Sequence, residues 1–133
     1  MIKKIALFIF AFPSLLFAQS YDVLFIGNSY TYYNNLPELV SNIANDFGDS
    51  LHYDQSTPGG TSLFAHSQNQ TTLNKISQQN WDFVVLQDQS QRPSLSPSYV
   101  AASVYPYATQ LVNFIDSNYI CSETVFYMTW GRK

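Results

Sequence analysis

The stretch Val23–Thr31, with the sequence VLFIGNSYT, decides how the rest of the chain is interpreted. It opens with a continuous run of apolar side chains, typical of a buried parallel strand, and open α/β sheets bind ligands at the carboxyl ends of their strands. Ser29 follows that end. Gly27 allows a close backbone approach or a sharp turn, and Asn28 tolerates a left-handed conformation. Ser29 is therefore either a nucleophile beside free backbone N–H groups or a turn residue whose hydroxyl bonds the local backbone.

The composition is that of one globular domain and argues against nucleic-acid binding. The 133 residues are 46% hydrophobic and 11% charged, with a formal net charge of −3. Six Lys and Arg residues cannot form the dense positive stripe that a phosphate backbone requires. The lone cysteine, Cys121, can form neither an intramolecular disulfide nor a thiolate metal site.

The first residues have the pattern of a secretory signal peptide. Two lysines precede an apolar run over residues 5–17, and the small residue Ala18 follows it. The run is shorter than the roughly 20 residues that span a bilayer. We therefore predict a signal peptide at 1–18 and a secreted or periplasmic domain at 19–133, with no stable membrane span after cleavage. An uncleaved anchor is the alternative.

Four apolar segments are predicted to be strands, with room for a helix in each crossover. The third of them is apolar without alternation and is therefore expected at the centre of a sheet. Right-handed crossovers between successive strands give a parallel sheet in a three-layer α/β sandwich. The four segments cover residues 21–26, 51–55, 81–86 and 124–130.

The most complete set of helix signals begins at Asn35. Asn35 can cap a helix, a proline falls in the first turn, and Glu38 occupies the capping-box position. Further helices are expected within 62–79 and over 98–116, where Pro106 should kink or split the helix. In the first helix the apolar side chains predicted to face the sheet are Leu36, Leu39, Val40, Ile43, Ala44 and Phe47.

Polar or glycine-rich loops follow the second and third predicted strands, at the edge where Ser29 is expected. Gly59 and Gly60 leave backbone N–H groups uncovered, which can donate to an anion or belong to a tight turn. Gln87 and Gln89 carry amides that can donate to an oxyanion, although a solvated loop has the same composition. Three candidate donor loops are thus predicted at one edge.

In this order the motifs resemble the SGNH hydrolase superfamily, also called GDSL hydrolases. The GNSYT segment resembles the first block of that family, with Ser29 in the place of the nucleophile and Asn28 where aspartate is more usual. The GGTS segment resembles the second block, whose glycine N–H helps to form the oxyanion hole. The resemblance gives this role to Gly60, with Gly59 as the neighbouring candidate.

This chain departs from the family pattern at the third and fifth blocks. The third is usually Gly-x-Asn-Asp, whereas this chain has Gln87–Ser90. The resemblance aligns Gln89 with the oxyanion-hole asparagine and leaves Gln87 as a second candidate. The fifth block, Asp-x-x-His, supplies the base and its orienting carboxylate, and neither His52 nor His66 belongs to such a motif. A lone histidine such as His66 is more often structural than catalytic.

The resemblance implies a flavodoxin-like sheet of strand order 2-1-3-4-5, of which four strands are present and the fifth is missing. We interpret the chain as truncated before the Asp-x-x-His block and nearly inactive in this form; a naturally short, non-catalytic relative is the alternative. An uncovered edge after the fourth strand favours truncation.

The function implied is that of an exported serine esterase acting on an O-acetylated carbohydrate or a similar small ester, with no metal and no cofactor. Ser29, Gly60 and Gln89 would be catalytic, and the residues lining the substrate site would be Asn28, Gly59, Gln87 and Tyr30. The alternative is a carbohydrate-binding domain in which Tyr30, Tyr32 and Tyr33 stack on sugar rings, or are only packing residues.

Overall fold

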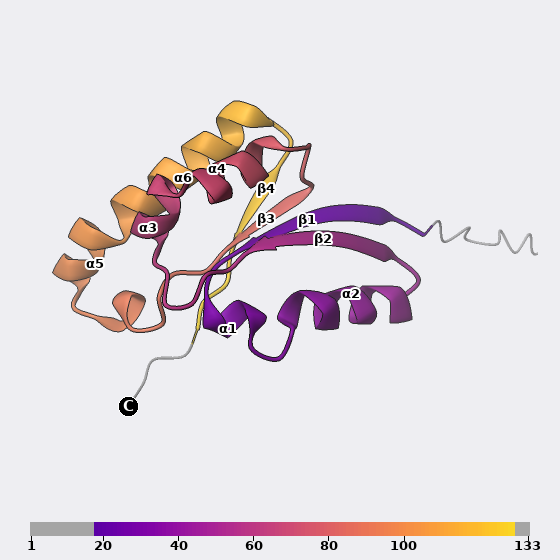
Figure 1. Ribbon diagram of the computed structural model, residues 1–133, viewed down its shortest axis with the longest axis horizontal. Helices are drawn as coiled ribbons and strands as arrows, with labels where there is room; N and C mark the ends of the chain where they lie inside the picture. The colour runs from indigo at the N-terminus through magenta and orange to yellow at the C-terminus, as the bar shows by residue number, and fades with distance from the viewer. Residues whose placement is uncertain (1–17, 130–133) are drawn as a thin grey trace, which may run out of the picture.

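The computed structural model describes residues 18–129 (Figure 1), so the predicted signal peptide lies almost wholly outside the described residues. Strands and helices alternate along the chain, as the apolar segments predicted. In order, the elements are β1 (Ser20–Ile26), α1 (Ser29–Tyr32), α2 (Leu36–Asp46), β2 (Ser50–Ser56), α3 (Leu63–Gln68), α4 (Gln70–Ser77), β3 (Phe83–Leu86), a 3-10 turn η1 (Arg92–Ser94), α5 (Pro97–Ser103), α6 (Tyr105–Asn118) and β4 (Glu123–Phe126).

The four strands form one parallel sheet in the order β2-β1-β3-β4. Because β1 lies between β2 and β3, its carboxyl end is flanked by the loops that follow both neighbours. This parallel α/β sheet is confirmed, and its order equals the first four strands that the resemblance implied. Among the described residues β4 pairs only with β3, so its outer edge is unpaired.

Helices cover both faces of the sheet and make three layers (Figure 1). Helices α1 and α2 lie on one face, and α3 to α6 lie on the other. The main core is between the sheet and the second group of helices. It is built from alternate strand residues, which point to one face, and from helix residues that pack on them: Leu24, Ile26, Val84, Leu86, Ile76, Leu111 and Ile115, among others.

In helix α2, the prediction of which apolar residues face the sheet is partly wrong. Three of the six apolar residues expected to face the sheet are instead on the surface: Leu39 is 51% exposed, Ile43 49% and Phe47 85%. They recur every four residues and so form one stripe. The helix packs on β2, the edge strand, and Pro37 is its buried residue, so the sheet beneath it is too narrow to cover the whole apolar arc.

The start of α2 also differs from the predicted capping box. Asn35 is the N-cap residue, but it has a left-handed backbone (φ 49°) and makes no side-chain capping bond. Its amide instead bonds the Glu38 carboxylate. The predicted effect of Pro106 is confirmed, because the helical segment is split into α5 and α6 with Val104 between them.

Candidate functional site

Gly27 sits where the end of β1 turns into α1, and it has no room for a side chain. Its N–H donates to Ser56 O at 3.0 Å. A Cβ at this position would lie 2.4 Å from Thr31 Oγ1 and 2.7 Å from Gln87 Oε1, closer than real contacts allow. The glycine is therefore required by close packing against two polar side chains.

Asn28 joins the three loops that follow β1, β2 and β3. Its Oδ1 accepts from the N–H of Tyr30 at 3.2 Å, which caps α1. Its Nδ2 donates to Thr61 O at 2.8 Å and to Asp88 O at 3.3 Å. The side chain is only 2% exposed. Asn28, which was predicted to line the substrate site, is thus a buried tie between loops that are distant in sequence.

Gln87 also holds the turn between β1 and α1 by hydrogen bonds. Its Oε1 accepts from Asn28 N at 3.0 Å and from Thr31 Oγ1 at 3.0 Å, and its Nε2 donates to Asp88 O. The residue is 1% exposed. Both ends of the amide are therefore engaged with protein, and Gln87 influences the predicted site by holding Asn28.

Ser29 is the first residue of α1 and is half-buried. Neither its hydroxyl nor its N–H makes a hydrogen bond to any residue in the range 18–129. Gly59 and Gly60 are exposed, and their N–H groups also find no acceptor within the described part of the chain. Gly60 has φ 70°, a conformation that favours glycine. Tyr30, next to Ser29, is half-buried at the same turn.

Gln89 is half-buried in the loop after β3, and its amide oxygen is used by its own loop. Gln89 Oε1 accepts from Gln91 N at 2.9 Å and from Arg92 N at 3.3 Å. Its amide nitrogen donates to no described residue and stays available. Of the two predicted glutamines, Gln89 is therefore the one with a free donor.

Asp88 lies between these glutamines and was not singled out from the sequence. Its Oδ1 accepts from Leu63 N at 2.9 Å and from Gln89 N at 2.7 Å, so it fixes the start of α3. Its Oδ2 lies 3.7 Å from Arg92 Nε, and neither atom has a hydrogen-bond partner among the described residues. The sequence feature that could have identified Asp88 is an acidic residue placed directly after a buried strand and before a polar loop.

His66 is a buried structural residue, as predicted. Its Nε2 lies 2.8 Å from Gly27 O and its Nδ1 2.9 Å from Thr72 Oγ1. Because a carbonyl only accepts, Nε2 carries the proton and Nδ1 accepts from the Thr72 hydroxyl. Burial lowers the pKa of His66, against smaller opposing effects of the Gly27 carbonyl and the Asp88 charge. The ring is thus neutral and faces the backbone.

The second histidine, His52, is exposed on β2. It lies opposite Asp22 in the register of β1 and β2, within the strands and not at their carboxyl ends. Neither histidine of the chain is therefore placed to accept a proton from Ser29.

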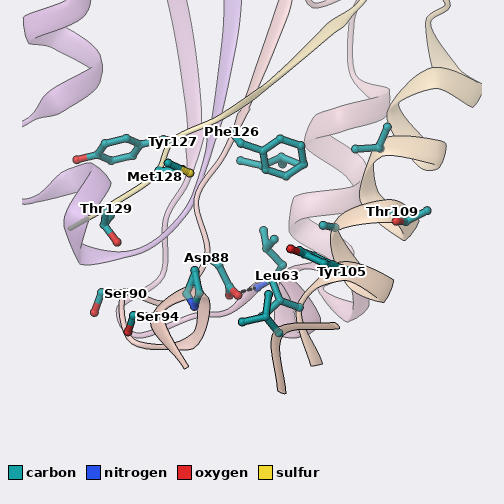
Figure 2. Close-up of a pocket in the computed structure, with 16 residues that line it drawn as sticks. Leu63, Asp88, Ser90, Ser94, Tyr105, Thr109, Phe126, Tyr127, Met128 and Thr129 are labelled. Carbon is teal, nitrogen blue, oxygen red and sulfur yellow. Dashed lines mark hydrogen bonds between the residues drawn. The ribbon is translucent and has the colours of Figure 1, made fainter. Parts of the chain in front are cut away.

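A cavity of about 780 Å³ opens beside this edge, between α5, α6 and the end of β4 (Figure 2). Asp88 and Ser90, from the loop after β3, line one part of it. Most of the wall is apolar, and Ser29 is not among the lining residues. The cavity therefore adjoins the loop network of Asn28 without including the predicted nucleophile.

Two other kinds of site are absent from residues 18–129. No group of three or more His, Cys, Asp or Glu side chains gathers there in a way that could hold a metal ion. No helix in this range has the length and apolar character needed to cross a membrane.

The chain is similar in fold to a crystal structure of a DUF4886 family protein from Bacteroides uniformis ATCC 8492. The two share 18% sequence identity with a TM-score of 0.61, over 84% of this chain and 50% of the other. The chain thus spans half the length of that structure. No protein-family model and no curated protein matches the sequence. The similarity supports the α/β fold alone.

Proposed function

We propose that the chain is part of an exported serine ester hydrolase of the SGNH type, with Ser29 as the nucleophile. The observation that carries the proposal is the Asn28 side chain, which bonds the loops after β2 and β3 beside Ser29. Three segments far apart in sequence therefore meet beside Ser29, and this supports the proposal. Deeply buried hydrogen bonds hold the turn rigidly, as a catalytic nucleophile needs.

In the proposed reaction, Ser29 Oγ attacks the ester carbonyl while a base takes the hydroxyl proton. The negative charge that develops on the carbonyl oxygen would be met by the free N–H groups of Ser29 and Gly60 and by the amide nitrogen of Gln89. The base then returns the proton to the departing alcohol, and water releases the acyl group from Ser29.

The base is the part of this mechanism that the chain does not supply. His66 is neutral, buried and bonded to Gly27 O, and His52 is on the surface of β2. We propose that the base comes from polypeptide outside these 133 residues. Without it, activity should be lower by several powers of ten, although the remaining donors still act.

A fluorophosphonate probe tests the proposal, because it forms a covalent bond with an activated serine. We expect slow labelling of Ser29, located by peptide mass spectrometry and accelerated by added imidazole as a substitute base. Ser29→Ala should abolish labelling, whereas Ser77→Ala, at an exposed serine of α4, should not. Labelling that survives Ser29→Ala, or none at Ser29 even with imidazole, would contradict the proposal.

A carbohydrate-binding domain is the second candidate, and the exposed tyrosines beside Ser29 favour it. Tyr32 is 45% exposed and Tyr33 73% exposed. The Tyr32 hydroxyl lies 3.5 Å from where a Cβ on Gly59 would be, so this ring borders the glycine loop. Sugar binding that is unchanged in Ser29→Ala and lost in Tyr33→Ala, with no covalent labelling, would favour this candidate over the esterase.

A further inference from the structure

The cavity between α5, α6 and the end of β4 has the dimensions of a small-molecule site. Its volume of about 780 Å³ falls within the range typical of ligand pockets. Val104, which directly precedes α6, and Ala108 and Val112 of α6 line it at intervals of four residues, which places them in one row. At 1.5 Å per residue this row is about 12 Å long. The helical wall is therefore a long strip of small aliphatic side chains.

Aromatic and thioether side chains from the end of β4 complete the apolar wall. Phe126 and Met128 line the cavity together with Tyr105 of α6 (Figure 2). Phe126 is 51% exposed and Met128 87% exposed, so both present apolar surface that no described residue covers. An elongated, uncharged aliphatic group fits such walls better than a sugar, which needs many hydrogen-bond partners.

The cavity has a polar end, formed by Asp88 and Ser90. Asp88 is 7% exposed and Ser90 is 6% exposed. Asp88 Oδ2 is fully buried and, within the described part of the chain, has no hydrogen-bond partner; the Arg92 Nε atom 3.7 Å from it has none either. Buried polar atoms are nearly always satisfied, so an unpartnered carboxylate oxygen at the cavity wall points to a ligand with a polar atom at this end.

The polar end is connected to the Ser29 turn. Asp88 O accepts from Asn28 Nδ2 at 3.3 Å, and Asn28 directly precedes Ser29. A ligand with an aliphatic chain along α6 would therefore have its polar head at the loop after β3, which Asn28 bonds to the Ser29 turn. In the opposite orientation the polar head would lie away from the carboxyl edge of the sheet.

We propose that this cavity binds the acyl chain of the substrate, a straight aliphatic chain of medium length such as octanoyl or decanoyl. This inference rests on the proposed esterase function and narrows its substrate to esters with an acyl group longer than acetyl. The acyl chain would enter the cavity at its Asp88–Ser90 end, and the ester group would lie outside that end, on the side of the Ser29 turn. Burying a charged carboxylate costs more free energy than burying an ester, so the uncharged ester binds better than the acid it yields.

The binding test uses the full chain and ligands that cannot be hydrolysed. N-phenyl-1-naphthylamine, an uncharged fluorescent probe, reports occupancy, and 2-decanone displaces it. We expect 2-decanone to compete at concentrations at least about 100-fold lower than 2-butanone, because each additional buried methylene favours binding. Decanoate should compete less well than 2-decanone. Equal competition by the two ketones, or none by 2-decanone, overturns the proposal.

Matched variants locate the binding. Ala108→Trp places an indole in the cavity and should weaken 2-decanone binding about tenfold or more. Ala65→Trp, at an exposed position of α3, should leave it unchanged. Thermal melts followed by circular dichroism confirm that both variants are folded; if Ala108→Trp is not, Thr109→Trp at the cavity rim replaces it. Equal affinity in cavity and control variants overturns the proposal.

Two outcomes separate this inference from the proposed function. Fluorophosphonate labelling of Ser29 without binding of 2-decanone leaves the esterase intact and overturns the acyl site. Cavity binding without labelling of Ser29 overturns both the esterase and the assignment of the ligand as a substrate. Light scattering on the same samples adds a third outcome: a dimer that 2-decanone dissociates and Ala108→Trp abolishes overturns the acyl site in favour of a second copy on this face.

Discussion

The Ser29 turn and the cavity beside it are neighbours that are built by opposite means. The turn is held by directional bonds, since the Gly27 carbonyl, the Asn28 amide and the Gln87 amide each have defined partners. The cavity is walled by apolar side chains on α6 and after β4, whose packing has no direction. Hydrogen bonds fix the place of atoms to within fractions of an ångström, whereas apolar walls fix only shape and volume. The turn is therefore suited to chemistry and the cavity to binding.

Of the variants that test this contrast, Asn28→Asp is expected to have the largest effect on stability. It introduces the residue that is more usual in the resembled family. A carboxylate cannot donate to Thr61 O and Asp88 O, and its charge would be buried against two carbonyl oxygens. We expect the free energy of unfolding to fall by about 3 kcal/mol, measured by urea denaturation. Asn45→Asp, at an exposed position of α2, is the control and should be nearly neutral.

Gly27→Ala tests the packing of the same turn. The new Cβ would be 2.4 Å from Thr31 Oγ1 and 2.7 Å from Gln87 Oε1, so both side chains must shift and their bonds weaken. We expect a loss of about 2 kcal/mol. The matched variant Gly59→Ala meets only the Tyr32 hydroxyl, at 3.5 Å, and should cost little. Equal losses in the two variants would contradict the close-packing explanation.

The buried His66 should make the stability of the turn depend on pH. Burial holds the pKa of His66 below its ordinary value of 6.5 in the folded protein. As pH falls below about 6.5, the unfolded chain takes up a proton that the folded chain does not, so stability is lost progressively towards the folded pKa. Urea denaturation from pH 8 to pH 5 measures this slope.

A comparison of the two histidines isolates the contribution of His66. His66→Gln, whose amide can still donate to Gly27 O, should flatten the pH dependence of stability, and His52→Gln, at an exposed position of β2, is the matched control. A slope that persists in His66→Gln would show that other groups cause it.

The smallest effect is expected at the rim of the cavity. Met128→Ser changes a side chain that is 87% exposed, so the free energy of unfolding should change by less than about 0.5 kcal/mol. The same variant should nevertheless weaken 2-decanone binding, because it removes an apolar contact from the cavity wall. A large loss of stability would mean that this segment packs more tightly than its exposure indicates.

Much of the fold could be predicted from local pattern. Apolar runs without alternation predicted the parallel strands, and Pro106 predicted the division of α5 from α6, since both effects depend on near neighbours in sequence. The inward face of α2 was predicted wrongly at Leu39, Ile43 and Phe47. Periodicity identifies an apolar arc on a helix but does not tell how wide a surface lies beneath it.

For the candidate site, too, the sequence predicted one part and only the tertiary structure decided the other. The sequence alone determined that glycine, serine and amide residues would gather at one edge of a parallel sheet, because strand direction brings loop ends together. Only the tertiary structure decided that Asn28 and Gln87 are buried ties, that Gln89 keeps a free donor, and that His66 faces the Gly27 carbonyl. The reason is physical: a polar side chain has the same donors and acceptors wherever it lies, and only its neighbours in space determine which of them remain free.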